Sequence, residues 1–205
     1  MKSVAITLAP AALVALTLVS CENPADKTAD ASVKEAAPVA EASGTRYVLT
    51  DASTVTFVGS KVTGSHEGGF KEISGDFTVD AAGDVTGGTV TIDMNSVWTD
   101  ADKLTDHLKT GDFFLVTEHP ESRFTITQIE KTDTGYSVSG NLLMRGVEKN
   151  ITFPATGSKD GETVKVNAEF DINRKDWGIV YAGKADDLIR DEVVIRFDLT
   201  AQPEA

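Results

Sequence analysis

The sequence predicts an all-β domain, a closed antiparallel barrel of about eight strands with one short helix inserted near residues 100–110. Apolar and polar residues alternate with a period of two in one segment after another. Turn-forming clusters at 80–84, 133–135 and 158–161 separate these segments. The chain has a single cysteine, Cys21, so a disulfide framework is excluded and the fold has to be stabilised by its core.

The alternation defines individual strands. Val90, Ile92 and Met94 share one face of a segment, and apolar residues recur at every second position of 164–172 and 193–199. Further strands are expected at 46–50, 54–62, 73–79, 124–130, 136–144 and 147–155. Long strands with one apolar face each favour a closed barrel over a two-layer sandwich, although the pattern fits both. The interior of such a barrel is either filled by side chains or holds one small ligand.

One segment breaks the alternation. Thr99 and Asp102 match a capping box, and Leu104 and Leu108 follow at helical spacing. The aromatic pair Phe113-Phe114 comes directly afterwards. A short helix followed by this pair would form a plug or lid over one end of the barrel. The alternative is that the same residues only close that end of the core.

The N-terminus indicates the location of the protein. Residues 1–20 match a secretory signal, with Lys2 before a long apolar run. The sequence LVSC that ends at Cys21 resembles the lipobox of bacterial lipoproteins, in which the cysteine is lipidated and the chain is cut before it. An uncleaved transmembrane anchor is the alternative, but Pro10 interrupts the run and no cluster of basic residues follows it. We therefore expect an acyl-anchored membrane protein of the bacterial cell envelope that faces the periplasm.

Composition divides the rest of the chain. Residues 21–45 are mostly Ala, Glu, Asp, Lys, Pro and Ser, which predicts a disordered tether. Residues 46–202 are long enough for one domain with a sizeable core. The formal net charge of −13 predicts that nucleic acid is not a partner, because an acidic surface repels phosphate backbones.

Catalytic and metal-binding signatures are missing from the sequence. It contains no Gly-x-Ser-x-Gly motif. His66, His107 and His119 are scattered without close metal-ligand spacing. We therefore expect no catalytic residues, no metal site and no cofactor.

Four segments resemble the YceI-like family. They are SKVTGSH at 60–66, DHLKTGDFF at 106–114 followed by His119-Pro120, GNLLMRGVEK at 140–149, and NRKDWGI at 173–179, where tryptophan replaces the usual phenylalanine. They occur in the family's order and extend over nearly all of the domain. The resemblance implies a lipocalin-like envelope barrel whose lumen takes a long isoprenoid chain, either a prenyl quinone or a polyprenyl phosphate. It implies no shared catalytic residue.

On this basis we expect a non-enzymatic lipid carrier with an apolar lumen. The residues expected to line or close the lumen are Phe57, Phe77, Ile92, Phe113, Phe114, Phe124, Phe153, Phe170 and Phe197. His107 is expected at one mouth, with Trp177 and Tyr181 at the opposite one. Charge makes Arg145, Lys149, Arg174, Lys175 and Lys184 candidates for a phosphate head group, or simply solvated surface residues. The alternatives are a filled barrel that docks an unknown envelope protein and an enzyme that acts on a prenylated substrate.

Overall fold

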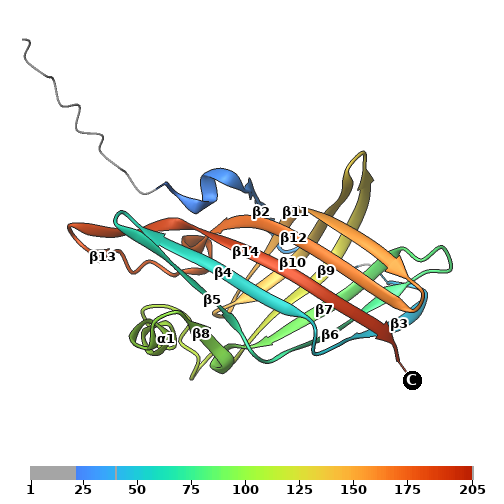
Figure 1. The fold of residues 1–205 in the computed structure, drawn as a ribbon, viewed down its shortest axis with the longest axis horizontal. Helices are drawn as coiled ribbons and strands as arrows, with labels where there is room; N and C mark the ends of the chain where they lie inside the picture. Colours follow the sequence, from blue (N-terminus) through green and yellow to red (C-terminus); the bar gives the residue numbers. More distant parts are fainter. Residues whose placement is uncertain (1–21, 40, 205) are drawn as a thin grey trace, which may run out of the picture.

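Eight antiparallel strand positions close into a barrel in the computed structural model, as the sequence predicts (Figure 1). The structure describes residues 22–39 and 41–204. Three positions consist of two strands laid end to end: β3 (Thr45–Leu49) with β4 (Thr54–Lys61), β5 (Gly64–Phe70) with β6 (Ile73–Val79), and β7 (Val85–Asp93) with β8 (Val97–Thr99). The others are β9 (Glu121–Thr132), β10 (Gly135–Met144), β11 (Val147–Asp160), β12 (Thr163–Asn173) and β14 (Asp187–Pro203).

The ring closes through the last strand. β14 pairs with β12 along one edge, from Val193 opposite Ile172 to Ala201 opposite Val164. Its other edge pairs with β3 and β4. The remaining pairs join sequence neighbours, so the barrel is an up-and-down meander. Closure of this kind removes the free edges that an open sheet would expose.

The predicted alternation sets the two faces of the barrel wall. Val90, Ile92 and Met94 are buried, and so are Phe170 and Ile172 of β12. Because successive strand residues point to opposite faces, these side chains point into the interior of the barrel. The core therefore lies inside the ring of strands.

Strand β5 was not predicted, because glycine hides its alternation. Gly64, Gly68 and Gly69 occupy three of its seven positions. A Cβ on Gly68 would lie 2.4 Å from the ring of Phe57 and 2.6 Å from the carbonyl oxygen of Trp98. Glycine at this position lets an aromatic ring cover the backbone closely.

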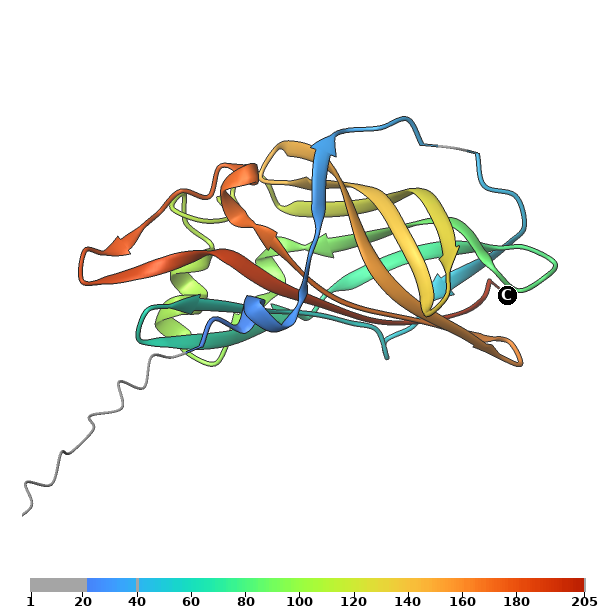
Figure 2. The same ribbon diagram turned by 90° about the horizontal axis from the view of Figure 1, so that it is seen from above.

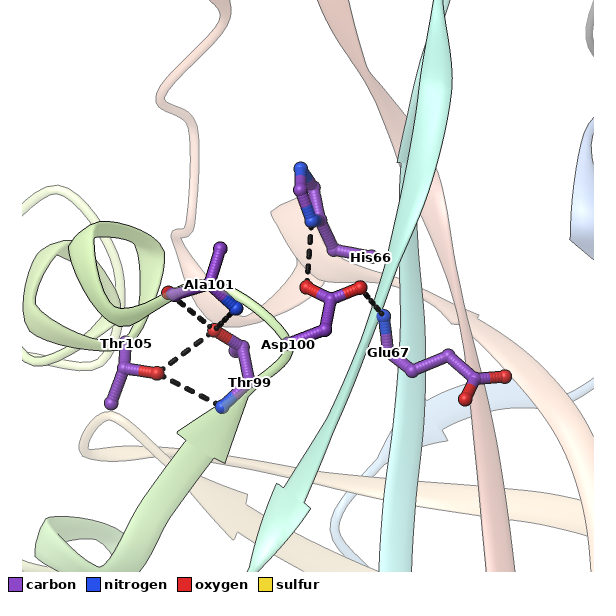
Figure 3. A network of polar contacts seen from close by, with 6 residues as sticks. All are labelled: His66, Glu67, Thr99, Asp100, Ala101 and Thr105. Atoms are coloured by element: carbon purple, nitrogen blue, oxygen red, sulfur yellow. Dashed lines mark hydrogen bonds and ion pairs between the residues drawn. The ribbon is translucent and has the colours of Figure 1, made fainter.

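The predicted helix is α1 (Asp102–Leu108), between β8 and β9. The capping box is wrong in detail, because the N-cap is Ala101, whose side chain has no polar atom. The Thr105 hydroxyl instead accepts from the amide of Thr99 (2.9 Å) and bonds to the Thr99 hydroxyl (2.8 Å). Figure 3 shows this closed turn. The other short elements are η1 (Pro24–Lys27), η2 (Met94–Ser96), η3 (Arg174–Trp177) and β13 (Gly183–Lys184).

The segment predicted to be a disordered tether is ordered over residues 22–39, so this prediction is wrong there. β1 (Ala29–Asp30) pairs in parallel with β12, and β2 (Ser32–Glu35) pairs antiparallel with β11. We call residues 28–37 the N-terminal strap. Figure 2 shows the strap in blue, crossing the barrel wall at a steep angle.

The strap lies where two barrel strands diverge. In the described part of the chain, β11 and β12 pair directly over Thr156–Asp160 and Thr163–Asn167. Beyond that stretch the two strands separate, and the strap occupies the space between them. Its backbone satisfies strand edges that would otherwise lack partners, which needs no apolar side chains. This is why a composition typical of disorder still gives an ordered segment.

Polar side chains of the outer wall are buried beneath the strap. The side-chain amide of Asn141 bonds to both backbone groups of Ala37. It accepts from the Ala37 N–H (3.0 Å) and donates to the Ala37 carbonyl (2.7 Å). Asp171 of β12 is 3% exposed and accepts from the Thr28 hydroxyl (2.8 Å). At the start of the ordered segment, Ala25 is buried in a small cluster with barrel residues. The strap is thus docked by specific polar contacts.

The proposed signal sequence and the lipidated Cys21 lie outside the described residues. Within residues 22–39 and 41–204, none of the helices has the length and apolar character needed to cross a membrane.

Candidate functional site: the barrel lumen

The barrel interior contains two apolar cavities. The larger one, about 320 Å³, lies beside α1 and is lined by Leu104 and Leu108 of that helix. We call it the α1-end cavity. The smaller one, about 210 Å³, lies at the opposite end, beside the hairpins that carry Asp84 and Lys159. We call it the far cavity. Ligand pockets typically have volumes of about 300–1,000 Å³, so the α1-end cavity alone is at the lower limit of that range.

The nine residues predicted for the lumen all line one of these cavities. The α1-end cavity has Phe57, Ile92, Phe113, Phe114 and Phe170 in its wall. Phe77 and Phe153 line the far cavity. Phe124 and Phe197 line both. The alternation of the strands places seven of these side chains inside, and the segment after α1 supplies Phe113 and Phe114. Contact of these side chains with a ligand stays a prediction.

A tight turn after α1 positions the aromatic pair. The Phe114 amide donates to the Leu108 carbonyl (3.0 Å), and the Val116 amide donates to the Lys109 carbonyl (3.1 Å). The Phe114 ring then lies 6.1 Å from the ring of Phe70, centroid to centroid, so it bridges the helix segment and the barrel wall. The helix and this turn form a lid over the α1-end cavity.

A polar pair connects the lid to the rim of the barrel (Figure 3). His66 of β5 lies 2.8 Å from Asp100, which directly precedes the helix segment. The other carboxylate oxygen of Asp100 accepts from the Glu67 amide (3.3 Å). The hydrogen bond from His66 is the main cause that lowers the pKa of Asp100 below its ordinary value. Because His66 also lines the cavity, this pair lies at the edge of the α1-end cavity.

The predicted mouth residues fall in two different places. His107, Phe113 and Tyr181 form an aromatic group over the lid, with ring centroids 5.0 Å apart for His107–Phe113 and His107–Tyr181. Tyr181 therefore lies at the same mouth as His107, and its assignment to the opposite mouth is wrong. The loop that follows η3 crosses back towards α1, which brings Tyr181 there.

Trp177 is not a mouth residue. Its side chain is 0% exposed, and its indole N–H donates to the Leu142 carbonyl (3.1 Å). η3 turns this side chain into the barrel wall, where it packs in the main core. The prediction that it gates a mouth is wrong, because the pattern NRKDWGI does not reveal which side of a single helical turn is covered.

Cationic side chains line the α1-end cavity at its rim. Arg174 is 4% exposed, and its guanidinium donates to the backbone carbonyls of Ile179 (2.5 Å) and Arg190 (3.0 Å). Burial is the main cause that lowers the pKa of Arg174. Lys61, which pairs with Asp187, lines the same cavity. Of the five predicted head-group cations, Arg174 is therefore the one in the cavity wall.

The other four predicted cations lie elsewhere. Lys149 pairs with Glu35 of the strap, and Lys175 pairs with Asp191. Arg145 donates to the carbonyls of Gly111 and Gly178, which ties the lid segment to the loop after η3. Lys184 is exposed on β13. Sequence reasoning missed Lys61 and His66 as lining residues, although both belong to the segment 60–66 that carries the family resemblance.

The histidines do not converge. His66 and His107 each bond to one carboxylate, of Asp100 and Asp112 respectively. Within the described ranges, 22–39 and 41–204, no three His, Cys, Asp or Glu side chains gather in an arrangement that could hold a metal ion. The chemistry offered by the site is an apolar interior with polar and cationic groups at one rim.

Solved structures share this architecture. The chain is 26% identical to BcnA of Burkholderia cenocepacia, with a TM-score of 0.65 over 73% of this chain and 96% of that one. It is 20% identical to a polyisoprenoid binding domain from Saccharophagus degradans, with a TM-score of 0.63 over 79% of this chain and all of that domain. At this identity the second likeness concerns the fold alone.

Curated relatives match the sequence over a shorter stretch. A UPF0312 protein of Pseudomonas putida is 32% identical over 121 residues, and the YceI protein of Salmonella arizonae is 34% identical over 122 residues. Each match covers 55% of this chain and 62% of the relative. The YceI-like domain itself matches residues 47–201, which form the whole barrel apart from its outermost positions. The chain therefore belongs to the YceI-like family.

Proposed function

We propose that this protein is a membrane-tethered lipoprotein of the cell envelope that carries a long-chain isoprenoid lipid in its barrel lumen and catalyses no reaction. The observation that carries this proposal is the α1-end cavity, whose wall is apolar except for Ser60, Ser122 and a rim formed by Lys61, His66 and Arg174. An isoprenoid lipid likewise has a long apolar chain that ends in a polar head group. A solved structure with the same fold is described as a polyisoprenoid binding domain, and the choice of ligand follows this likeness of fold.

The energetics favour such a ligand without any charged contact in the interior. Burial of apolar surface contributes about 25 cal/mol for each Å² removed from water. A branched hydrocarbon chain enclosed by phenylalanine and aliphatic side chains buries nearly all of its surface. The rim can satisfy the head group, a quinone through hydrogen bonds or a phosphate through charge. The lipobox-like sequence ending at Cys21 supports an anchor that keeps the barrel close to its lipid source.

Native mass spectrometry, paired with solvent extraction, tests this function directly. The chain from residue 21, carrying Cys21→Ser, is purified from a bacterial host. We expect a stoichiometric additional mass that extracts as a prenyl quinone or a polyprenol. A protein that is free of ligand, and stays so after incubation with both lipid classes, would contradict the carrier function and favour a filled barrel that docks a partner.

A charge placed in the lid is expected to abolish lipid retention. Phe114→Asp puts a carboxylate against Phe70 and into the apolar wall of the α1-end cavity, where an unpaired charge is strongly unfavourable. Thr117→Asp adds the same charge at an exposed position of the same segment and should retain lipid like the wild type. Extracted lipid per mole of folded protein is the readout. Equal lipid content in the two variants would show that the lid does not enclose the ligand.

A further inference from the structure

Four phenylalanine rings meet across the middle of the barrel. They come from four strands: Phe124 from β9, Phe153 from β11, Phe170 from β12 and Phe197 from β14. The centroids of Phe153 and Phe170 are 4.0 Å apart with an interplanar angle of 9°. Phe197 meets both of these rings edge-on, at 5.9 and 5.6 Å, and lies 6.2 Å from Phe124. We call this group the phenylalanine partition.

The partition lies between the two cavities. Phe153 lines the far cavity and Phe170 lines the α1-end cavity, so the stacked pair presents one ring to each side. Phe124 and Phe197 line both cavities. Val90 lines both cavities as well. The lumen is therefore divided into two compartments by these four aromatic rings together with Val90.

The rings differ in how firmly they are held. Phe153 and Phe170 are 4% and 0% exposed, and Phe124 is buried as well. Phe197 is only partly buried, and cavity space adjoins it on both sides. A side chain next to empty space can change rotamer with little loss of packing, whereas a ring stacked on all sides cannot. Phe124 also adjoins both cavities, but it is buried, so Phe197 has the most freedom of the four rings to change rotamer.

We propose that the phenylalanine partition selects isoprenoid ligands by chain length and that Phe197 is the specificity-determining residue. This inference rests on the proposed carrier function. A short prenyl chain that enters beneath the lid ends at the partition and fits the α1-end cavity with the rings in place. A longer chain has to displace Phe197 to reach the far cavity. The displacement costs binding free energy, because part of the ligand's interaction is spent on reorganising the protein.

Phe197→Ala is expected to change the preference between chain lengths. Removal of the ring joins the two cavities and eliminates the cost of displacement. The affinity for solanesol, a long prenol, should then rise about tenfold relative to the affinity for farnesol, a short prenol. A tenfold change in affinity corresponds to about 1.4 kcal/mol, which is comparable to the free-energy cost of forcing one side chain out of its preferred rotamer. Both alcohols are measured by displacement of a fluorescent prenyl probe from the Cys21→Ser protein.

Two further variants make the experiment decisive. Val194→Ala removes apolar volume from the same strand at a buried position that lines neither cavity, so it should leave the ratio of the two affinities unchanged. Phe197→Leu keeps an apolar side chain in the core and should give a smaller shift in the same direction, even if Phe197→Ala does not fold.

The two proposals fail in different ways in this experiment. If neither alcohol displaces the probe from the wild-type barrel, the carrier function is contradicted. If both alcohols bind, but Phe197→Ala and Phe197→Leu have the same affinity ratio as the wild type and Val194→Ala, the barrel remains a carrier and chain-length selection by the partition is overturned.

Discussion

Replacement of Trp177 by alanine is expected to lower the free energy of unfolding by about 3–5 kcal/mol. The indole is fully buried in the main core, and its N–H donates to the carbonyl of Leu142. Alanine leaves a large cavity and also removes the partner of a backbone carbonyl, which adds a desolvation cost. Urea unfolding of the Cys21→Ser protein measures the change.

Trp177→Phe separates packing from hydrogen bonding at this position. Phenylalanine fills most of the volume but has no N–H to donate, so the expected loss is about 1–3 kcal/mol. Both variants should leave the α1-end cavity intact, because Trp177 is not among its lining residues. A change below about 0.5 kcal/mol for Trp177→Ala, typical of surface positions, would contradict the assignment of this residue to the barrel wall.

The strands were predictable because alternation reports burial directly. Along β12, and in β7 from Thr89 to Asp93, interior residues are apolar and their neighbours are polar, which fixes both the strand and its inner face. By the same rule, seven of the nine predicted lumen residues point into the barrel, and their contact with a ligand stays a prediction. Alternation did not predict β5, because Gly68 and Gly69 have no side chains that would indicate a buried or an exposed face. The backbone needs glycine at these positions to approach Phe57 and Trp98 closely.

The sequence alone could not place the short elements. The mouth position of Tyr181 and the buried position of Trp177 depend on the direction in which one turn of η3 faces, and no periodicity is available in a single turn. The helix α1 was predictable from leucine spacing, but Thr99 was paired with the wrong residue. A hydroxyl at Thr105 satisfies the turn as well as a carboxylate at Asp102 would.

The strap was missed for a physical reason of a different kind. Disorder is predicted when a segment cannot bury enough apolar surface to offset its ordering entropy. The strap avoids this limit because β11 and β12 already present strand edges, and pairing with an existing edge orders few additional residues. Its docking depends on partners far away in the sequence, such as Asn141 and Asp171, which local composition does not reveal.

Docking of the strap is expected to weaken as the pH rises through the raised pKa of Asp171. Burial is the main cause that raises the pKa of Asp171 above its ordinary value of 3.8, and the carboxylates of Asp30 on the strap and Glu192 on β14 raise it further. The protonated carboxyl is therefore favoured while the strap is docked. Its contribution is fully present below the ordinary value and is lost as the pH rises through the raised one.

Hydrogen exchange at the Ala31 amide measures this loss, because that amide donates to the Asp171 carbonyl (2.9 Å). After correction for the intrinsic rate, its protection should fall by up to about tenfold per pH unit across the titration. Asp171→Asn keeps an acceptor for the Thr28 hydroxyl but carries no charge, so protection should become independent of pH and higher at neutral pH. Asp198→Asn, at an exposed position of β14, should keep the wild-type slope.

If protection of the Ala31 amide depends on pH in Asp171→Asn as it does in the wild type, this carboxyl does not control the strap.

If protection in Asp171→Asn is independent of pH, control of the strap by Asp171 also affects the lumen. The strap covers the separation between β11 and β12, and Ile151 and Phe170 on those strands line the α1-end cavity. A strap that loosens with pH would therefore expose the side of the ligand chain rather than its end. Lipid exchange should then accelerate with pH in the wild type and stay constant in Asp171→Asn, even though both retain the same lid.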